Sequence, residues 1–235
     1  MGRAARIARR GRLVDEPQQR DASTRPRTVL LVNPNMNRRT TALMTGLAQV
    51  ELPSAVRVAG VTAERGPAMI VDPAALARAE GAVLDVARKA VEAHRPDAVI
   101  VAAIGDPGRA ALQRALDVPV IGIGQASIRA AAAGGRRFGM ATTTHELVGA
   151  YGCRERFTGV SLSRRGPLEL ASDPEAQYLE LLEAVRASRA RGAEAVIIAG
   201  GPLSDTARRL RDAVDLPIVE PVPAACALLR ETGIV

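Results

Sequence analysis

DAVIVAAIGDPG at residues 97–108, followed by LDVPVI at 116–121, returns as EAVIIAGGPLSD at 194–205, followed by VDLPIV at 214–219. Each copy reads as an acidic residue, a short buried strand, a turn of small residues, an amphipathic helix and a second strand entered through proline. Two similar α/β halves that face each other place their strand ends on opposite walls of one cleft, where α/β sheets bind ligands. The repeat therefore predicts a small-molecule site between two lobes.

Length and composition agree with this prediction. A chain of 235 residues that is 47% hydrophobic is large enough to bury one or two cores. No apolar run approaches the roughly 18 residues that a membrane span requires. The first 27 residues hold no apolar stretch typical of a signal peptide. We therefore expect a cytoplasmic protein with no membrane partner.

The net charge of +7 is concentrated at one end of the chain. Residues 1–27 hold eight arginines and three acids, which leaves 24 basic against 22 acidic side chains elsewhere. With 2% aromatic residues, the chain has few rings on which bases of a nucleic acid could stack. We interpret residues 1–27 as an arginine-rich, disordered leader rather than a nucleic-acid-binding arm, and we expect no nucleic-acid partner.

The two cysteines, Cys153 and Cys226, are too few for a disulfide framework. No cluster of Cys and His has the spacing of a metal site, so we expect no structural metal. Both cysteines are interpreted as small hydrophobic residues in or near the core.

Strands and helices alternate along the chain, which predicts parallel sheets joined by right-handed crossovers. We divide the chain into the leader, a first lobe at 28–124 and a second lobe at 125–221, and expect the last helix, within 222–235, to pack back on the first lobe. Asp72, Asp106 and Ser204 are predicted to cap the helices that follow them. Strands are predicted at 28–32, 57–61, 138–141 and 160–162, and helices at 40–49, 73–93, 125–133, 175–191 and 223–231.

Four segments converge on the expected cleft, at residues 33–35, 102–106, 142–145 and 199–204. Three of them are small or polar turns with a helix start close behind, so backbone N–H groups and positive helix ends should face the cavity. Such a cavity favours a carboxylate or another small anion. The candidate substrate-binding residues are Asn33, Asn35, Ala103, Ile104, Thr142, Thr143, Thr144, Gly200 and Gly201.

Several short motifs follow one another in a specific order. They are VNPN at 32–35, Gly66-Pro67, GDPG at 105–108, PVIGIG at 119–124, RFG at 137–139 and the VII strand at 196–198. In this order the chain resembles the hydantoin and allantoin racemase branch of the Asp/Glu racemase superfamily, over roughly residues 28–235. The resemblance implies two pseudo-symmetric flavodoxin-like lobes with parallel sheets and an inter-lobe cleft. It also implies no cofactor, a homodimer or larger homo-oligomer, and a substrate with an acidic hydrogen beside a carbonyl.

The resemblance further implies a cysteine at the end of each matched strand. One thiolate removes the α-proton and the opposite thiol delivers a proton to the other face. In this chain the two positions read Ala103 and Gly200. Neither Cys153 nor Cys226 lies at a matching place, so the sequence argues against racemisation by two thiols.

Two other residues are candidates for the proton transfer. His145 directly follows a run of threonines at a strand end, and imidazole is well matched to proton transfer near neutral pH. The alternative is that His145 is an exposed residue in the first turn of a helix. Glu220 follows the last strand, where the resemblance suggests an aspartate, and is interpreted either as a carboxylate base in the cleft or as a helix cap.

The sequence therefore predicts a racemase-fold enzyme that polarises the carbonyl of a small carboxylate, cyclic amide or keto compound and moves a proton with a non-thiol group. Its reaction would be of the isomerase or lyase/cyclase type. One alternative is a non-catalytic small-molecule binding or regulatory protein. Another is a true racemase that uses other residues.

Overall fold

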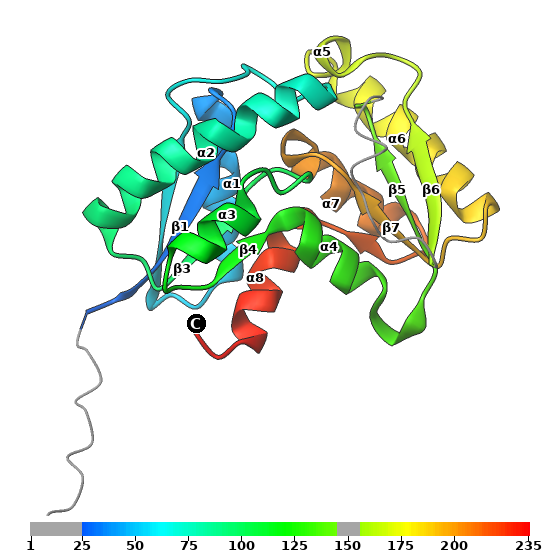
Figure 1. Ribbon diagram of the computed structural model, residues 1–235. Coiled ribbons are helices and arrows are strands. Elements are labelled where there is room, and N and C mark those ends of the chain that lie inside the picture. Colours follow the sequence, from blue (N-terminus) through cyan, green and yellow to red (C-terminus); the bar gives the residue numbers. More distant parts are fainter. Residues whose placement is uncertain (1–24, 145–155) are drawn as a thin grey trace, which may run out of the picture.

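Each copy of the repeat forms two adjacent strands of a four-stranded parallel sheet, one inner strand and one edge strand. The structure is a computed structural model that describes residues 25–144 and 156–235, and it contains two such sheets (Figure 1). The strand orders are β2-β1-β3-β4 and β6-β5-β7-β8, so each strand of one sheet has a counterpart in the other. The predicted α/β class with two pseudo-symmetric lobes is confirmed.

The elements alternate as predicted. The first sheet and its helices are β1 (Arg27–Asn33), α1 (Arg38–Glu51), β2 (Val56–Thr62), α2 (Pro73–His94), β3 (Ala98–Val101), α3 (Arg109–Ala115) and β4 (Val120–Gly122). The second begins with α4 (Ile123–Ala131), the 3₁₀ turn η1 (Ala133–Gly135), β5 (Phe138–Thr142), β6 (Phe157–Leu162), α5 (Pro167–Leu170) and α6 (Pro174–Ala190). It ends with β7 (Ala195–Ile198), the 3₁₀ turn η3 (Gly201–Leu203), α7 (Ser204–Ala213), β8 (Ile218–Val219) and α8 (Pro221–Glu231).

The acidic residue that opens each copy of the repeat fastens two strands together. The Asp97 carboxylate accepts a hydrogen bond from the Thr28 N–H at 2.7 Å, and the Asp97 N–H donates to the Thr28 carbonyl at 2.7 Å. Glu194 repeats both bonds with the backbone of Arg137, each at 2.8 Å. In each lobe the acid therefore sets the register between the start of the third strand and the start of the first.

Two helices link the lobes. The helix α4 follows the first sheet but contacts β7 and β8, whereas α8 follows the second sheet but contacts α1 and β4. Figure 1 shows α4 and α8 side by side at the centre of the molecule. One apolar core runs through this contact and includes Leu31, Met140 and the fully buried Cys226. Burial of this core holds the two lobes against each other.

Two of the three predicted helix caps are wrong. Asp72 does cap α2, because its carboxylate accepts from the Ala75 N–H at 2.5 Å. The helix α3, however, begins after Gly108 rather than after Asp106. Ser204 lies inside α7, and its hydroxyl donates to the Gly201 carbonyl at 2.9 Å.

No helix within residues 25–144 or 156–235 is both long enough and apolar enough to cross a membrane.

Candidate active site

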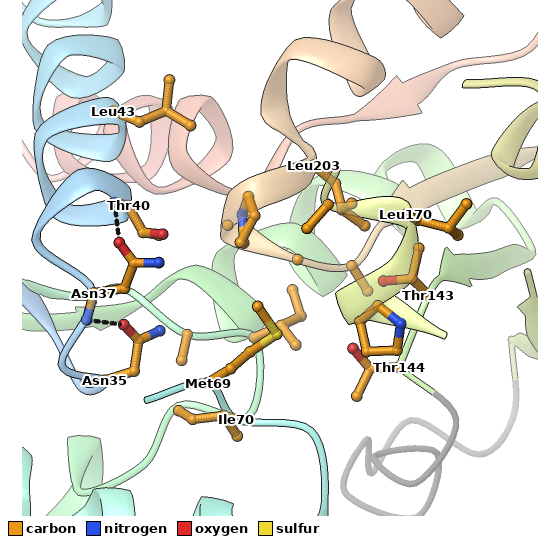
Figure 2. Close-up of a pocket in the computed structure, with 18 of the residues that line it drawn as sticks. Asn35, Asn37, Thr40, Leu43, Met69, Ile70, Thr143, Thr144, Leu170 and Leu203 are labelled. Atoms are coloured by element: carbon orange, nitrogen blue, oxygen red, sulfur yellow. Dashed lines mark hydrogen bonds between the residues drawn. The ribbon is translucent and has the colours of Figure 1, made fainter. Parts of the chain in front are cut away.

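A cavity of about 530 Å³ lies between the lobes, at the carboxyl ends of β3 and β7. Residues 102–105 after β3 and 199–203 after β7 both reach its surface, as the repeat predicts. Figure 2 shows Asn35, Asn37 and Thr40 on one side of it and Thr143 and Thr144 on the other. The predicted site between two lobes is therefore present as a cavity.

The turn after β3 lines the cavity with residues whose backbone donors are unpaired. Ala103, Ile104 and Gly105 line it, and their N–H groups have no acceptor among the described residues. We call these three N–H groups the amide cradle. Adjacent unpaired amides form a concave site for an oxyanion or another anion.

The asparagine turn after β1 is only partly exposed to the cavity. Asn35 and Asn37 line it, whereas Asn33 is fully buried. The Asn33 side-chain amide donates to Asn35 Oδ1 at 3.0 Å, to the Asn37 carbonyl at 3.1 Å and to Thr41 Oγ1 at 2.9 Å. The buried Asn33 side chain therefore stabilises the turn through hydrogen bonds. It does not lie on the cavity surface, so that part of the prediction is wrong.

The side chains of Asn35 and Asn37 also serve the turn. Asn35 Oδ1 accepts from the Asn37 N–H at 2.9 Å, and Asn37 Oδ1 caps α1 by accepting from the Thr40 N–H at 3.1 Å (Figure 2). Both carbonyl oxygens are thus committed. The side-chain NH₂ groups of Asn35 and Asn37 are the donors that remain for a ligand.

The run of threonines at the end of β5 is also only partly exposed to the cavity. Thr142 is buried, and its hydroxyl donates to the Ala199 carbonyl at 2.7 Å and accepts from the Thr144 N–H at 3.2 Å. It joins the ends of β5 and β7 and is not among the residues that line the cavity, unlike the position predicted for it. Thr143 and Thr144 do line the cavity.

Glu220 does not line the cavity. It is 5% exposed, its Oε1 accepts from the Arg211 guanidinium at 2.9 Å, and its Oε2 has no partner in the described part of the chain. Burial raises the pKa of this carboxyl, and Arg211 partly opposes that shift. The side chain makes no cap bond to α8, and Pro221 and Pro223 leave Val222 as the one N–H donor among the first three residues of that helix.

His145 and Cys153 lie outside the described residues. Cys226 lies in the shared core, where burial raises the pKa of its thiol to about 12. The predicted structural role of Cys226 agrees with this position. Among residues 25–144 and 156–235, no group of three or more His, Cys, Asp and Glu could hold a metal ion.

Some residues at the cavity were missed by the sequence analysis. Arg39 and Asp205 line it from the first turns of α1 and α7, and neither has an ion-pair partner among the described residues. The sequence signal that could have identified Arg39 and Asp205 is their position directly after a turn at the end of a strand. Met69 and Ile70 lie in the long connection between β2 and α2, after the Gly66-Pro67 motif and outside it.

Asp106 lies just behind the amide cradle. Its carboxylate accepts from the Gly124 N–H at 2.8 Å and from the Gln125 N–H at 2.7 Å. Burial raises the pKa of Asp106 to about 6, although both hydrogen bonds and Arg109 act to lower it. The acid thus caps α4, a helix 18 residues further along the chain, instead of α3.

The family model described as Asp/Glu/Hydantoin racemase matches residues 29–229. The chain belongs to this family. Hydantoin racemase from Paenarthrobacter aurescens is 28% identical over 206 residues, which cover 84% of this chain and 87% of that protein. Allantoin racemase from Pseudomonas fluorescens has a TM-score of 0.79 at 27% identity, covering 88% of this chain and 92% of that one. The resemblance predicted from the motifs is confirmed.

A solved structure of lower identity shows likeness in the fold alone. Arylmalonate decarboxylase has a TM-score of 0.62 at 15% identity, covering 87% of this chain and 91% of that one. The relatives with racemase names are isomerases, and this chain shares their family and fold.

Proposed function

We propose that the protein is a cofactor-independent enzyme that moves a proton at a carbon beside the carbonyl of a small cyclic amide, keto compound or carboxylate. The observation that carries this proposal is the amide cradle at Ala103, Ile104 and Gly105. Removing a proton beside a carbonyl places negative charge on the carbonyl oxygen, and preorganised N–H donors stabilise that charge. Membership of the racemase family supports the same class of chemistry.

The group that moves the proton is proposed to differ from the two thiols of the family. Ala103 and Gly200 reach the cavity from the ends of β3 and β7, where the resemblance places those thiols. Neither residue carries a group that can ionise. We therefore retain His145 as the candidate base, because it follows Thr144, which lines the cavity. The product would come from isomerisation, or from a lyase or cyclase reaction through the same enolate-like intermediate.

The lining of the cavity bears on the substrate. Leu43, Met69, Ile70 and Leu203 supply apolar surface, and Arg39 supplies a guanidinium without an ion-pair partner in the described part of the chain. An apolar substituent on one side and a carboxylate or amide on the other would match both features. A cavity of about 530 Å³ holds a substituted five-membered ring with room to spare.

One observation favours a second candidate function. The two strand-end positions that face the cavity, Ala103 and Gly200, offer no proton-transfer group, so a non-catalytic small-molecule binding or regulatory protein would use the same cavity. The family relatives named as racemases favour catalysis instead. A homodimer or larger homo-oligomer also remains a proposal, and light scattering of the purified protein would measure it.

The decisive experiment is hydrogen–deuterium exchange at carbon. The protein is incubated in deuterated water with 5-substituted hydantoins, keto acids and arylmalonates, and the α-proton signal is followed by NMR. Catalysed loss of that signal is the expected result, and chiral chromatography then separates racemisation from a lyase outcome. A ligand that binds, as measured by calorimetry, without catalysed exchange would favour the binding protein.

A further inference from the structure

The turn that carries the amide cradle is held in an unusual backbone conformation. Asp106 has φ 48°, in the left-handed region that residues other than glycine rarely adopt. Its N–H donates to the Ala103 carbonyl at 2.9 Å, which closes a tight turn directly behind the cradle. The contacts of the Asp106 side chain must therefore offset the free-energy cost of this backbone conformation.

Those contacts are made with the first turn of α4. The two carboxylate oxygens accept from the N–H groups of Gly124 and Gln125, at 2.8 and 2.7 Å. The N-cap residue of α4 is Gly122, which has no side chain to cap the helix itself. Asp106 thus satisfies two helix donors and, through the same bonds, fastens the cradle turn to α4.

Two glycines permit this close approach. A Cβ added at Gly122 would lie 2.1 Å from Asp106 Cγ, and one added at Gly124 would lie 1.9 Å from the Ile104 carbonyl oxygen. Side chains at either place would push the turn and the helix apart. The backbone of the cradle turn therefore packs directly against the backbone of α4, and the Asp106 carboxylate holds the two together by hydrogen bonds.

We propose that Asp106 is the positioning residue of the amide cradle, and that its ionised carboxylate keeps the Ala103, Ile104 and Gly105 N–H groups aimed into the cavity. The catalytic part of this proposal rests on the proposed function. A neutral acid has one carbonyl oxygen and one hydroxyl, so protonation removes the charged acceptor from one of the two α4 amides and loosens the turn. Burial already raises the pKa of Asp106 to about 6, and Arg109 is the charged group that acts against this shift. The cradle should therefore weaken as the pH falls through about 6.

The test compares Asp106→Asn with Asp97→Asn. Asp97 also ties two backbone segments together through its carboxylate, but it does so at the opposite end of β3. Asp106→Asn should lower kcat for α-proton exchange by about 10-fold or more, with KM changed less than about threefold, because the cradle acts on the developing oxyanion. It should also remove the acid limb near pH 6, whereas Asp97→Asn keeps both kcat and the limb at a temperature where it is folded.

Two results would overturn the proposal. One is an Asp106→Asn protein with wild-type kcat and the same pH profile, even if its Gly124 and Gln125 amides exchange faster with solvent, since Asp106 would then be a structural cap only. The other comes from the unmodified protein, which needs no variant to fold. In an NMR titration from pH 5 to 8, the amides of residues 103–105 should shift together with those of Gly124 and Gln125, and independent behaviour would contradict the coupling.

Failure of the proposed function gives a different pattern. If the protein exchanges no carbon-bound proton in any substrate, a 5-substituted hydantoin serves as a binding probe, with calorimetry as the readout. Loss of binding in Asp106→Asn, with Asp97→Asn unaffected, would still support the positioning role. Equal binding by both variants, together with independent pH shifts of the amides of residues 103–105 and of Gly124 and Gln125, would overturn it.

Discussion

The two lobes share one strand order but secure their central helix in opposite ways. In the first lobe, Asp106 caps α4 with a carboxylate, and Gly122 leaves room for it. In the second lobe, Leu203 and Glu220 occupy the matching places, and α8 begins with two prolines that have no N–H to satisfy. The duplicated backbone arrangement is therefore kept by its buried strands, while the helix starts at the cleft are free to diverge.

The same difference separates the two cavity walls. The wall after β3 has three unpaired N–H groups, whereas in the turn after β7 the Gly200 N–H donates to the Ile198 carbonyl at 3.2 Å and Pro202 has no N–H. We infer a division of labour in which the first lobe stabilises negative charge and the second supplies the group that moves the proton.

The largest effect is expected at His145, the proposed proton-transfer group of the second lobe. His145→Gln should lower kcat by about 100-fold to 10,000-fold, because general acid–base catalysis contributes factors of that size. The pH–rate profile should lose one limb, and the melting temperature should change little. Full turnover in the variant would contradict the division of labour and move the proton transfer to the substrate or to another group.

The second prediction restores the thiols that the family resemblance implies. Ala103→Cys combined with Gly200→Cys should raise racemisation of a 5-substituted hydantoin by about 100-fold over the unmodified protein, as measured by polarimetry. At Gly200, a Cβ would lie 3.0 Å from Leu203 Cγ and Cδ1, a side chain that has room to shift. Each single variant is the control. Its racemisation rate should rise far less, because one thiol must remove the proton from one face of the α-carbon and the other must deliver a proton to the opposite face. An unchanged racemisation rate in the double variant would show that the two cavity walls no longer place residues 103 and 200 on opposite faces of the substrate carbon.

The third prediction concerns the fit between the cradle turn and α4. Gly124→Ala should lower the free energy of unfolding by about 2 kcal/mol, because the added Cβ would lie 1.9 Å from the Ile104 carbonyl oxygen. The matching place in the second lobe already holds the buried Val222. Gly46→Ala is the control, since a Cβ there meets nothing within 4 Å, and it should instead stabilise α1 by about 0.5–1 kcal/mol. Urea titration measures both changes in the free energy of unfolding. Equal stabilities of the two variants would contradict the close packing between the cradle turn and α4.

The smallest effect is expected at Cys226, which belongs to the core that both lobes share. Burial raises the pKa of its thiol to about 12, so the thiol stays protonated and should resist iodoacetamide at neutral pH. Activity after treatment should stay within about threefold of the untreated value. In the Ala103→Cys, Gly200→Cys protein, the cavity thiols should react first, and mass spectrometry would identify the modified peptides. Rapid modification of Cys226 in the folded protein would contradict its burial.

The sequence predicted the elements at the site better than it predicted the direction of individual side chains. Apolar strands and amphipathic helices were found because their periodicity is local to each segment. Asn33 and Thr142 were assigned to the cavity because they follow buried strands, yet both turn inward to bond with neighbouring backbone or side chains. Sequence position identifies the end of a strand, but it does not say which nearby donor or acceptor a polar side chain will meet.

The amino-acid sequence alone establishes the duplicated strand pattern, the strand ends that meet at the cavity and the absence of ionisable groups at Ala103 and Gly200. Only the tertiary structure decided that Asp106 caps α4 and that Glu220 is buried beside Arg211, away from the cavity. The physical reason is that burial of a periodic apolar face is encoded residue by residue along one segment. The partner of a polar group depends instead on which unsatisfied donors are brought within about 3 Å when distant segments pack.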